Sequence, residues 1–469
     1  MKRLYIGNTT SDTDRLVTEL ATQNNTVNHG LITRASDIVE DGFYHSTVVD
    51  ITPAEIAKLA CDILLLDQPK ESFSTTKEYH DTQQLVNSNN THWQQLIEDN
   101  KSFCIFPFIS HSLNHENTTL CCRSKQPVAK TENFDWNTSL LDIRNNMLQG
   151  TRIDNCSGCY KIEDSGGISA RQSQTIDWAS RLDLTSVEDL NFNKPIMYDV
   201  FPNNTCNLMC RMCVPEYSVL IKREQNDHND YPVTNWDYID LEDAQVVYIA
   251  GGEPTAMLDF QKFLDRCEQE NRLDLEIRIN TNANKISERL FEKLDRFKNI
   301  VFTVSIDGYG QANDYSRWLS SWEDISKNIR RIADNGHSVN FNITVSIYTI
   351  FSFYNLVEYL NKNYPDKTVN IGYAGFKDDI LNPFVFEYSD KILNKISSID
   401  KMDIYYNNKN LQNFVQNLLV NAKSSTLNAK KLTEFFEYND NLDKLRNSRL
   451  QDYISELEKK RHLIGVSNG

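Results

Sequence analysis

The chain has 469 residues, of which 40% are hydrophobic, 10% aromatic and 24% charged. This ordinary globular composition excludes wholesale disorder, collagen-like repeats and a coiled-coil fibre, and roughly 150 residues per domain suggest about three units. The formal net charge of −16 excludes a general positive field, so it disfavours a nucleic-acid partner. No apolar run reaches the ~18 residues of a membrane span, and we expect no signal peptide.

Ten cysteines without a secretory signal favour metal binding or redox chemistry over structural disulfides, and we expect a cytoplasmic protein. Cys61 and Cys267 stand alone within apolar helical patterns, which is typical of small buried side chains. The other eight fall into two groups, the first being Cys104, Cys121, Cys122, Cys156 and Cys159 and the second Cys206, Cys210 and Cys213.

Residues 1–95 are expected to form a small α/β domain. A strand at Leu4–Ile6, an amphipathic helix at Asp12–Thr22 and a strand at Ile63–Leu66 indicate a small parallel sheet. Nothing in these elements carries an identifiable chemistry.

Residues 96–185 hold the first cysteine group in a loop-rich setting with one amphipathic helix, at Ser139–Leu148. A segment of this kind buries little apolar area, so an internal metal would stabilise it. Its polar stretch Glu163–Arg171 is expected to be a solvated linker, with a substrate-facing loop as the alternative.

Residues 190–376 show a regular alternation of strands and helices. The apolar, strand-like runs are Ile196–Phe201, Val246–Ala250, Leu275–Asn280, Ile300–Ile306, Val339–Ile347 and Val369–Ala374. The helix-compatible stretches between them include Phe260–Glu268, Ser287–Phe297, Trp322–Ala333 and Phe353–Asn361. This alternation predicts a parallel sheet, either open or curled into a partial (β/α)6 barrel of the TIM type. Residues 377–469 are expected to be a helical region without chemistry, ending in a solvated helix at Leu450–Leu463.

In parallel α/β folds the chemistry lies at the C-terminal ends of the strands. Unusual residues follow four of the runs in order, namely a cysteine triad, Gly251-Gly252-Glu253-Pro254, Asn280-Thr281-Asn282 and Ser305-Ile306-Asp307. The triad, Cys206-x3-Cys210-x2-Cys213, supplies soft thiolates that suit zinc or an iron–sulfur cluster. Structural zinc prefers four ligands, and no fourth follows nearby, so the spacing favours a [4Fe–4S] cluster over zinc or unligated thiols.

The triad after the first strand, together with the Gly-Gly-Glu-Pro sequence after the second, resembles the radical S-adenosylmethionine (SAM) superfamily over roughly residues 195–375. The resemblance implies that Cys206, Cys210 and Cys213 hold a [4Fe–4S] cluster whose free iron binds SAM. It also implies reductive cleavage of SAM to a 5′-deoxyadenosyl radical, which abstracts hydrogen from a substrate.

The same resemblance assigns the SAM-binding residues. Gly251, Gly252 and Glu253 would hold the amino group, while Ser305 and Asp307 would bind the ribose or carboxylate. Asn282 is a further candidate for this pocket, and Arg317 resembles an arginine near the SAM carboxylate, with a surface arginine as the alternative. Met212 departs from the family, in which the residue before the last cysteine is often aromatic.

The upstream cysteines resemble the SPASM/twitch region of radical SAM enzymes, although that region usually follows the barrel. The resemblance implies one auxiliary [4Fe–4S] cluster with the ligands Cys104, Cys122, Cys156 and Cys159. Cys121 could replace Cys122, and a structural zinc is an alternative for the whole set.

The resemblance implies an enzyme that oxidises its substrate or forms a bond in it, with a reductant such as ferredoxin or flavodoxin as partner. The substrate class stays open between a peptide and a small metabolite or carbohydrate. The alternatives are a non-catalytic iron–sulfur electron carrier or sensor and a zinc-stapled binding scaffold.

Overall fold

The computed structural model describes residues 2–6, 47–51, 92–124, 126–164, 168–374 and 379–465. The chain forms two compact units, one of residues 1–109 and 137–193 and the other of residues 110–136 and 194–469. Across these described stretches, none of the helices has both the length and the apolar character that crossing a bilayer takes.

In the first unit, β1 (Lys2–Ile6) pairs with β2 (Thr47–Ile51) in antiparallel orientation. The strand predicted at Leu4–Ile6 is confirmed, but its described pairing is not the expected parallel one. The partner strand is Thr47–Ile51, and an antiparallel pair needs no crossover helix. The predicted helix at Asp12–Thr22, the predicted strand at Ile63–Leu66 and Cys61 lie outside the described residues.

Four helices of the first unit follow, and they make it more helical than the sequence suggested. They are α5 (Phe106–Ile109), α6 (Leu141–Leu148), α7 (Ser157–Asp164) and α8 (Ala170–Arg181), and a further helix over residues 92–99 precedes them. The second of these confirms the helix predicted at Ser139–Leu148. Ser169 begins α8 with a capping box, in which its side chain accepts from the backbone N–H of Gln172.

The interpretation of Glu163–Arg171 as a solvated linker is wrong at both ends. The Arg171 guanidinium lies 2.6 Å from the Glu163 carboxylate, and both side chains are buried. Arg171 also donates to the carbonyl oxygen of Phe103 at 2.6 Å. A buried arginine needs such partners, so the Glu163 and Arg171 ends of this segment pack into the first unit.

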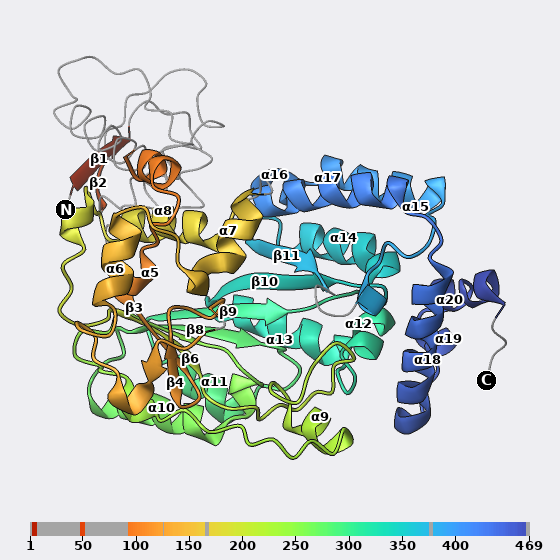
Figure 1. Cartoon of the computed structure of the whole chain (residues 1–469), viewed down its shortest axis with the longest axis horizontal. Coiled ribbons are helices and arrows are strands. Elements are labelled where there is room, and N and C mark those ends of the chain that lie inside the picture. Colours follow the sequence, from red (N-terminus) through yellow and green to blue (C-terminus); the bar gives the residue numbers. More distant parts are fainter. Residues whose placement is uncertain are drawn as a thin grey trace. The chain divides into compact units, whose positions relative to one another are not determined.

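Within its described residues, the second unit is built on a nine-stranded sheet in the order β11-β10-β9-β8-β7-β6-β3-β4-β5 (Figure 1). The strands that run parallel and in sequence order are β6 (Met197–Phe201), β7 (Val246–Ile249), β8 (Glu276–Thr281), β9 (Asn299–Ser305), β10 (Ser338–Val345) and β11 (Val369–Tyr373). All six lie within two residues of the predicted runs, which confirms the α/β fold.

The sheet continues beyond β6 in a way that the sequence did not predict. β3 (Ser110–Asn114) pairs with β6 in parallel orientation. β4 (Asn117–Thr119) and β5 (Ala129–Lys130) then add antiparallel strands. These strands are short and polar, so they lack the apolar alternation that identifies a strand.

Helices alternate with the parallel strands along the chain, and all but the first of them share one hydrophobic core with the strands. They are α9 (Val219–Glu224), α10 (Leu258–Gln269), α11 (Glu288–Leu294), α12 (Gln311–Ser316), α13 (Trp322–Asp334) and α14 (Phe353–Asn363). Every second residue of β8, β9 and β10 is buried. The residues between them face the other side of the sheet and are largely polar, among them Arg278, Asn280, Thr303, Ser305, Asn340 and Asn342.

The C-terminal part is helical, as predicted. It contains α15 (Asp390–Ser397), α16 (Asp403–Asn407), α17 (Lys409–Ser424), α18 (Ala429–Arg446), α19 (Leu450–Tyr453) and α20 (Ser455–Glu458). The expected solvated helix at Leu450–Leu463 is wrong, because the segment is broken into short turns and buries Leu450, Ile454 and Leu457. These three residues are spaced as on one face of a helix, and the many charged residues around them led to the expectation of a solvated segment.

Candidate functional site

The three cysteines of the triad lie in the loop 202–218 that follows β6, called the cysteine loop below. Cys206, Cys210 and Cys213 are half-buried. Burial raises the pKa of Cys206 and of Cys213 to about 12, and it also raises the pKa of Cys210. Mutual repulsion of the thiolates adds to the shift at Cys206 and Cys213, so these thiols lie close enough to interact. A positively charged metal group offsets this cost, and its binding would release the thiol protons.

The two glycines after β7 let the backbone pack directly on the cysteine loop. Gly251 has a φ of 121°, a conformation that L side chains rarely adopt. A Cβ atom on Gly252 would lie 2.2 Å from the carbonyl oxygen of Thr205. That oxygen accepts a 2.7 Å hydrogen bond from the backbone N–H of Glu253. The Gly-Gly-Glu segment and the cysteine loop are therefore one packed unit.

The Glu253 carboxylate is fully buried and joins the ends of β7 and β8. Its Oε1 accepts from the N–H and hydroxyl of Thr255 at 3.1 and 2.7 Å and from the Thr281 hydroxyl at 2.6 Å. Its Oε2 accepts from the backbone N–H of Asn282 at 2.6 Å. Burial raises the pKa of Glu253, although these donors oppose the shift. This carboxylate thus organises the strand ends, and its contact with a SAM ammonium stays a prediction.

Asn282 extends the same network to the cysteine loop. Its side-chain N–H donates to Asn207 Oδ1 at 2.8 Å, and its own Oδ1 accepts from the backbone N–H of Asn284 at 2.9 Å. Thr281 and Asn207 were missed as site residues by the sequence analysis. Thr281 stands inside the Asn-Thr-Asn sequence and Asn207 between two of the cysteines, so their positions alone could have identified them.

Asp307 and Arg317 form a buried ion pair after β9. Arg317 Nη1 lies 2.7 Å from Asp307 Oδ2, and the side chains are 14% and 2% exposed. Asp307 Oδ1 accepts from the backbone N–H of Thr344 at 3.0 Å. Ser305, two residues before Asp307, donates to Asn280 Oδ1 at 3.2 Å on the polar face of the sheet.

Arg317 is therefore not a surface arginine. Burial lowers its pKa, but the negative charges of Cys210, Asp307 and Cys206 outweigh burial and raise the pKa overall. Its Nε is buried and has no hydrogen-bond partner among the described residues. A buried donor beside the cysteine thiols can bind an anion such as a carboxylate.

The upstream cysteines are divided between the two units. In the first unit Cys104 is buried, Cys156 ends the short 3-10 helix Asp154–Cys156 directly before α7, and Cys159 lies in the first turn of α7. Burial raises the pKa of Tyr160, and the charges of Cys156 and Cys104 raise it further, so both thiols lie near this ring.

In the second unit, the backbone N–H of Cys122 donates to Asp199 Oδ2 at 2.9 Å, and Cys121 lies beside it. The ligand set with Cys104, Cys156 and Cys159 draws on both units, so it stays a prediction. Among the described residues, no three Cys, His, Asp or Glu side chains gather as a single metal ion requires. Cys267 is fully buried in α10, as predicted for a structural cysteine.

Comparison with known proteins identifies the middle of the chain. The family model described as the radical SAM superfamily matches residues 200–360. The radical SAM cyclopropyl synthase TigE of Paramaledivibacter caminithermalis is 24% identical over 213 residues, which are 41% of this chain and 44% of TigE. The match thus spans less than half of this relative's length.

Solved structures show weaker similarity. Streptococcus suis SuiB bound to precursor peptide SuiA has a TM-score of 0.32 and 14% identity over 59% of this chain and 65% of SuiB. Native anSMEcpe with bound AdoMet has a TM-score of 0.33 and 17% identity over 52% of this chain and 66% of that protein.

The matched residues run from the end of β6 to α14. They include the cysteine loop, the Gly-Gly-Glu segment and the Asp307–Arg317 pair. Residues 200–360 therefore form a radical SAM superfamily domain.

Proposed function

We propose that the protein is an enzyme that binds a [4Fe–4S] cluster through Cys206, Cys210 and Cys213 and cleaves SAM reductively. The observation that carries the proposal is the buried Nε of Arg317, which has no hydrogen-bond partner among the described residues. The charge of Cys210 raises the pKa of this arginine, so the two side chains interact electrostatically. The cluster and SAM, when bound, supply a 5′-deoxyadenosyl radical for hydrogen abstraction from a substrate carbon.

The residues of the chain bind and orient in this proposal. Arg317 pairs with the SAM carboxylate through its Nε while Asp307 holds its Nη1. Gly251 and Gly252 bring the backbone to the amino group, and Glu253 keeps their segment fixed against the cysteine loop. The packed strand ends keep bulk water away from the reacting atoms.

Asn282 and Ser305 complete the pocket in the proposal. Asn282 is tied to the cysteine loop through Asn207, and Ser305 lies on the polar face of the sheet. Both side chains offer hydrogen bonds that suit the ribose or carboxylate of SAM.

The substrate is a peptide or a small metabolite or carbohydrate, and the reaction is oxidation or bond formation at the carbon that loses hydrogen. The polar face of the sheet, with Asn280 and Asn342 hydrogen-bonded to each other at 3.2 Å, offers neutral donors and acceptors that suit either class. A reductant such as ferredoxin or flavodoxin supplies the electron, and we place the protein in the cytoplasm.

An auxiliary [4Fe–4S] cluster, held by Cys104, Cys122, Cys156 and Cys159, anchors substrate or accepts the second electron. Tyr160 supports the assignment of Cys104 and Cys156 to the same site, because the charges of both thiols raise its pKa.

Anaerobic reconstitution followed by reduction in the presence of SAM tests the proposal. Two clusters require about eight irons per chain, and the reduced sample should release 5′-deoxyadenosine. Zinc in the triad would support the scaffold alternative, and a fully loaded sample that releases no 5′-deoxyadenosine would support the carrier. Cys210→Ala should abolish SAM cleavage, whereas Cys156→Ala should leave some cleavage without substrate product; equal loss in both would contradict the two assigned roles.

A further inference from the structure

The middle of the cysteine loop is held by hydrogen bonds along its backbone. The N–H of Met209 donates to the carbonyl oxygen of Trp318 at 2.9 Å, and the N–H of Arg211 donates to that of Ser316 at 2.7 Å. Cys210 lies between these two anchored residues, so its position follows theirs. One edge of this segment is thus bound to the chain around Arg317.

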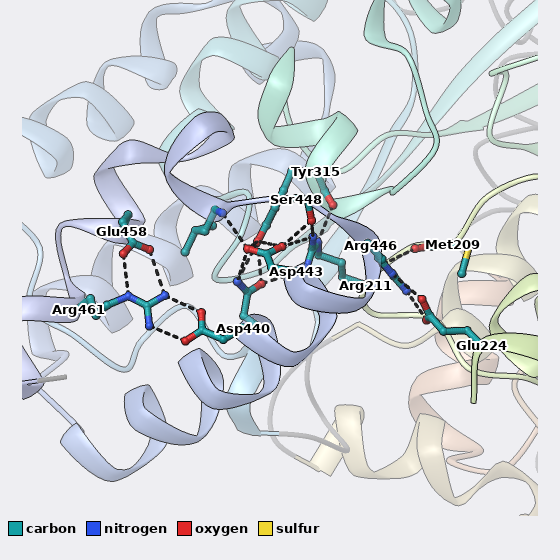
Figure 2. A network of polar contacts seen from close by, with 12 residues as sticks. Met209, Arg211, Glu224, Tyr315, Asp440, Asp443, Arg446, Ser448, Glu458 and Arg461 are labelled. Carbon is teal, nitrogen blue, oxygen red and sulfur yellow. Dashed lines mark hydrogen bonds and ion pairs between the residues drawn. The ribbon is translucent and has the colours of Figure 1, made fainter. Parts of the chain in front are cut away.

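The other edge is bound to the C-terminal helix α18. The Tyr438 hydroxyl donates to the carbonyl oxygen of Arg211 at 2.8 Å. Arg446 Nη1 donates to the carbonyl oxygen of Met209 at 2.8 Å, while the rest of its guanidinium forms a bidentate pair with Glu224. The N–H and C=O groups of both neighbours of Cys210 are therefore paired, half of them to side chains of α18. Figure 2 shows the contact of Arg446 with Met209.

The Arg211 side chain is the strongest link between the loop and α18. Its guanidinium is fully buried and lies 2.6 Å from Asp443, which is itself nearly buried. It also donates to Tyr315 O at 3.0 Å, Asn439 Oδ1 at 3.2 Å and Ser448 Oγ at 2.9 Å. The Arg211 Cζ atom stacks over the Tyr315 ring at 3.7 Å from its centroid. These directional contacts fix the arginine in one orientation.

Asp443 is in turn held by groups on both sides of the helix end. Its oxygens accept from the Tyr315 hydroxyl at 2.8 Å, from Ser448 Oγ at 2.7 Å and from the backbone N–H of Leu450 at 2.8 Å. The end of α18, the start of α19 and the cysteine loop therefore meet at one carboxylate (Figure 2).

We propose that α18 positions the cluster-binding loop, with Arg211 and Asp443 as its main positioning residues. The inference rests on the proposed function, because the positioned atom is the Cys210 sulfur that would bind iron. It assigns a role to the C-terminal region, whose sequence shows no chemistry. Neither residue touches the cluster or SAM, so both act through the placement of Cys210.

Asp443→Asn is the informative variant, because it keeps the size of the side chain and removes the charge that Arg211 needs. Asp440→Asn is its matched control on the same helix. Asp440 forms a bidentate pair with Arg461 at 2.7 Å and joins α18 to the C-terminal tail, without a contact to the cysteine loop (Figure 2).

Both variants are expressed as full chains and reconstituted anaerobically. The measurements are iron content, the electron paramagnetic resonance spectrum of the reduced cluster with and without SAM, and the rate of 5′-deoxyadenosine formation. We expect Asp443→Asn to bind iron, to show an altered SAM-induced spectrum and to form 5′-deoxyadenosine at least about tenfold more slowly, since small misplacements of reacting groups cost that much. Asp440→Asn should match the wild type in all three.

Tyr438→Phe removes a single hydroxyl from the loop carbonyl and keeps the proposal testable if Asp443→Asn fails to fold. It should shift the spectrum in the same direction by a smaller amount. Spectra of Asp443→Asn and Tyr438→Phe that equal those of the wild type, or equal changes in Asp440→Asn, would overturn the positioning role. A wild type that binds its cluster but never cleaves SAM would overturn the proposed function instead, and the spectra without SAM would still decide the positioning role.

Discussion

Replacing Arg317 by glutamine separates its contact with Asp307 from its proposed contact with SAM. Among the described residues, the substitution leaves the Asp307 carboxylate, which is 2% exposed, with only the backbone N–H of Thr344 as a partner. Breaking a buried ion pair in this way costs about 3–5 kcal/mol of unfolding free energy. Loss of a hydrogen bond from the Arg317 Nε to a carboxylate costs about 1.5–3 kcal/mol of binding free energy, which is roughly 10- to 150-fold in the SAM dissociation constant.

The double variant Asp307→Asn/Arg317→Gln tells the two effects apart. Because it buries no unpaired charge, we expect it to recover most of the stability that Arg317→Gln loses. SAM affinity should stay as weak in the double variant as in the single one. Equilibrium binding of SAM to the reconstituted protein and urea denaturation provide the two numbers. The reasoning is refuted if Arg317→Gln unfolds more easily but binds SAM as tightly as the wild type.

Three further predictions concern the second unit, which contains Gly252, Glu253 and His111. Gly252→Ala should lower the iron bound at the triad severalfold, because its Cβ would lie 2.2 Å from a carbonyl oxygen of the cysteine loop. Gly372→Ala is the control and should bind iron normally, because a Cβ atom on Gly372 would have no described atom within 4 Å. Glu253→Gln should lose about 1.5–3 kcal/mol of unfolding free energy in urea, because in either orientation the amide NH2 group faces a donating backbone N–H, that of Asn282 or that of Thr255. Unchanged stability would contradict the role given to this carboxylate. Burial lowers the pKa of His111 from 6.5 to about 4, so the unfolded chain binds the proton first and stability falls as the pH drops from 6.5 toward 4. Between pH 7 and pH 5 this loss is about 2 kcal/mol, and denaturation curves of His111→Gln should show a correspondingly weaker pH dependence.

Three of the parallel strands, β8, β9 and β10, could be predicted because they combine apolar side chains with a two-residue alternation, and β6 and β7 because they are short, nearly continuous apolar runs. Ile277 and Ile279 in β8, and Phe341 and Ile343 in β10, are buried in the core, and their two-residue spacing alone predicts a strand. The residues at the strand ends could be named because the order of the strands brings them to one edge of the sheet. Local pattern and topology were sufficient for these features.

The contacts of α18 could not be predicted, since they depend on pairs that are far apart in the chain. Arg211 and Asp443 are separated by 232 residues, and each is an ordinary charged residue in its own segment. The β3 strand was missed for another reason. Its buried side chains include Ser110, His111 and Ser112, which are polar, and His111 and Ser112 are hydrogen-bonded to Thr118 and Thr119 of β4, a pairing that local pattern does not reveal.

Two arginines next to the cysteines show why hydrogen-bond partners carry more functional information than residue type. Arg211 and Arg317 are both buried, and both lie beside Cys210 in the folded chain. The guanidinium of Arg211 donates hydrogen bonds through all three of its nitrogens to four protein acceptors, so these nitrogens are already paired within the protein. Arg317 pairs with Asp307 through one nitrogen and keeps a buried Nε without a described partner. A buried donor is costly to leave unpaired, which supports the proposal that Arg317 binds an anion, whereas the saturated guanidinium of Arg211 supports its proposed role in positioning the loop.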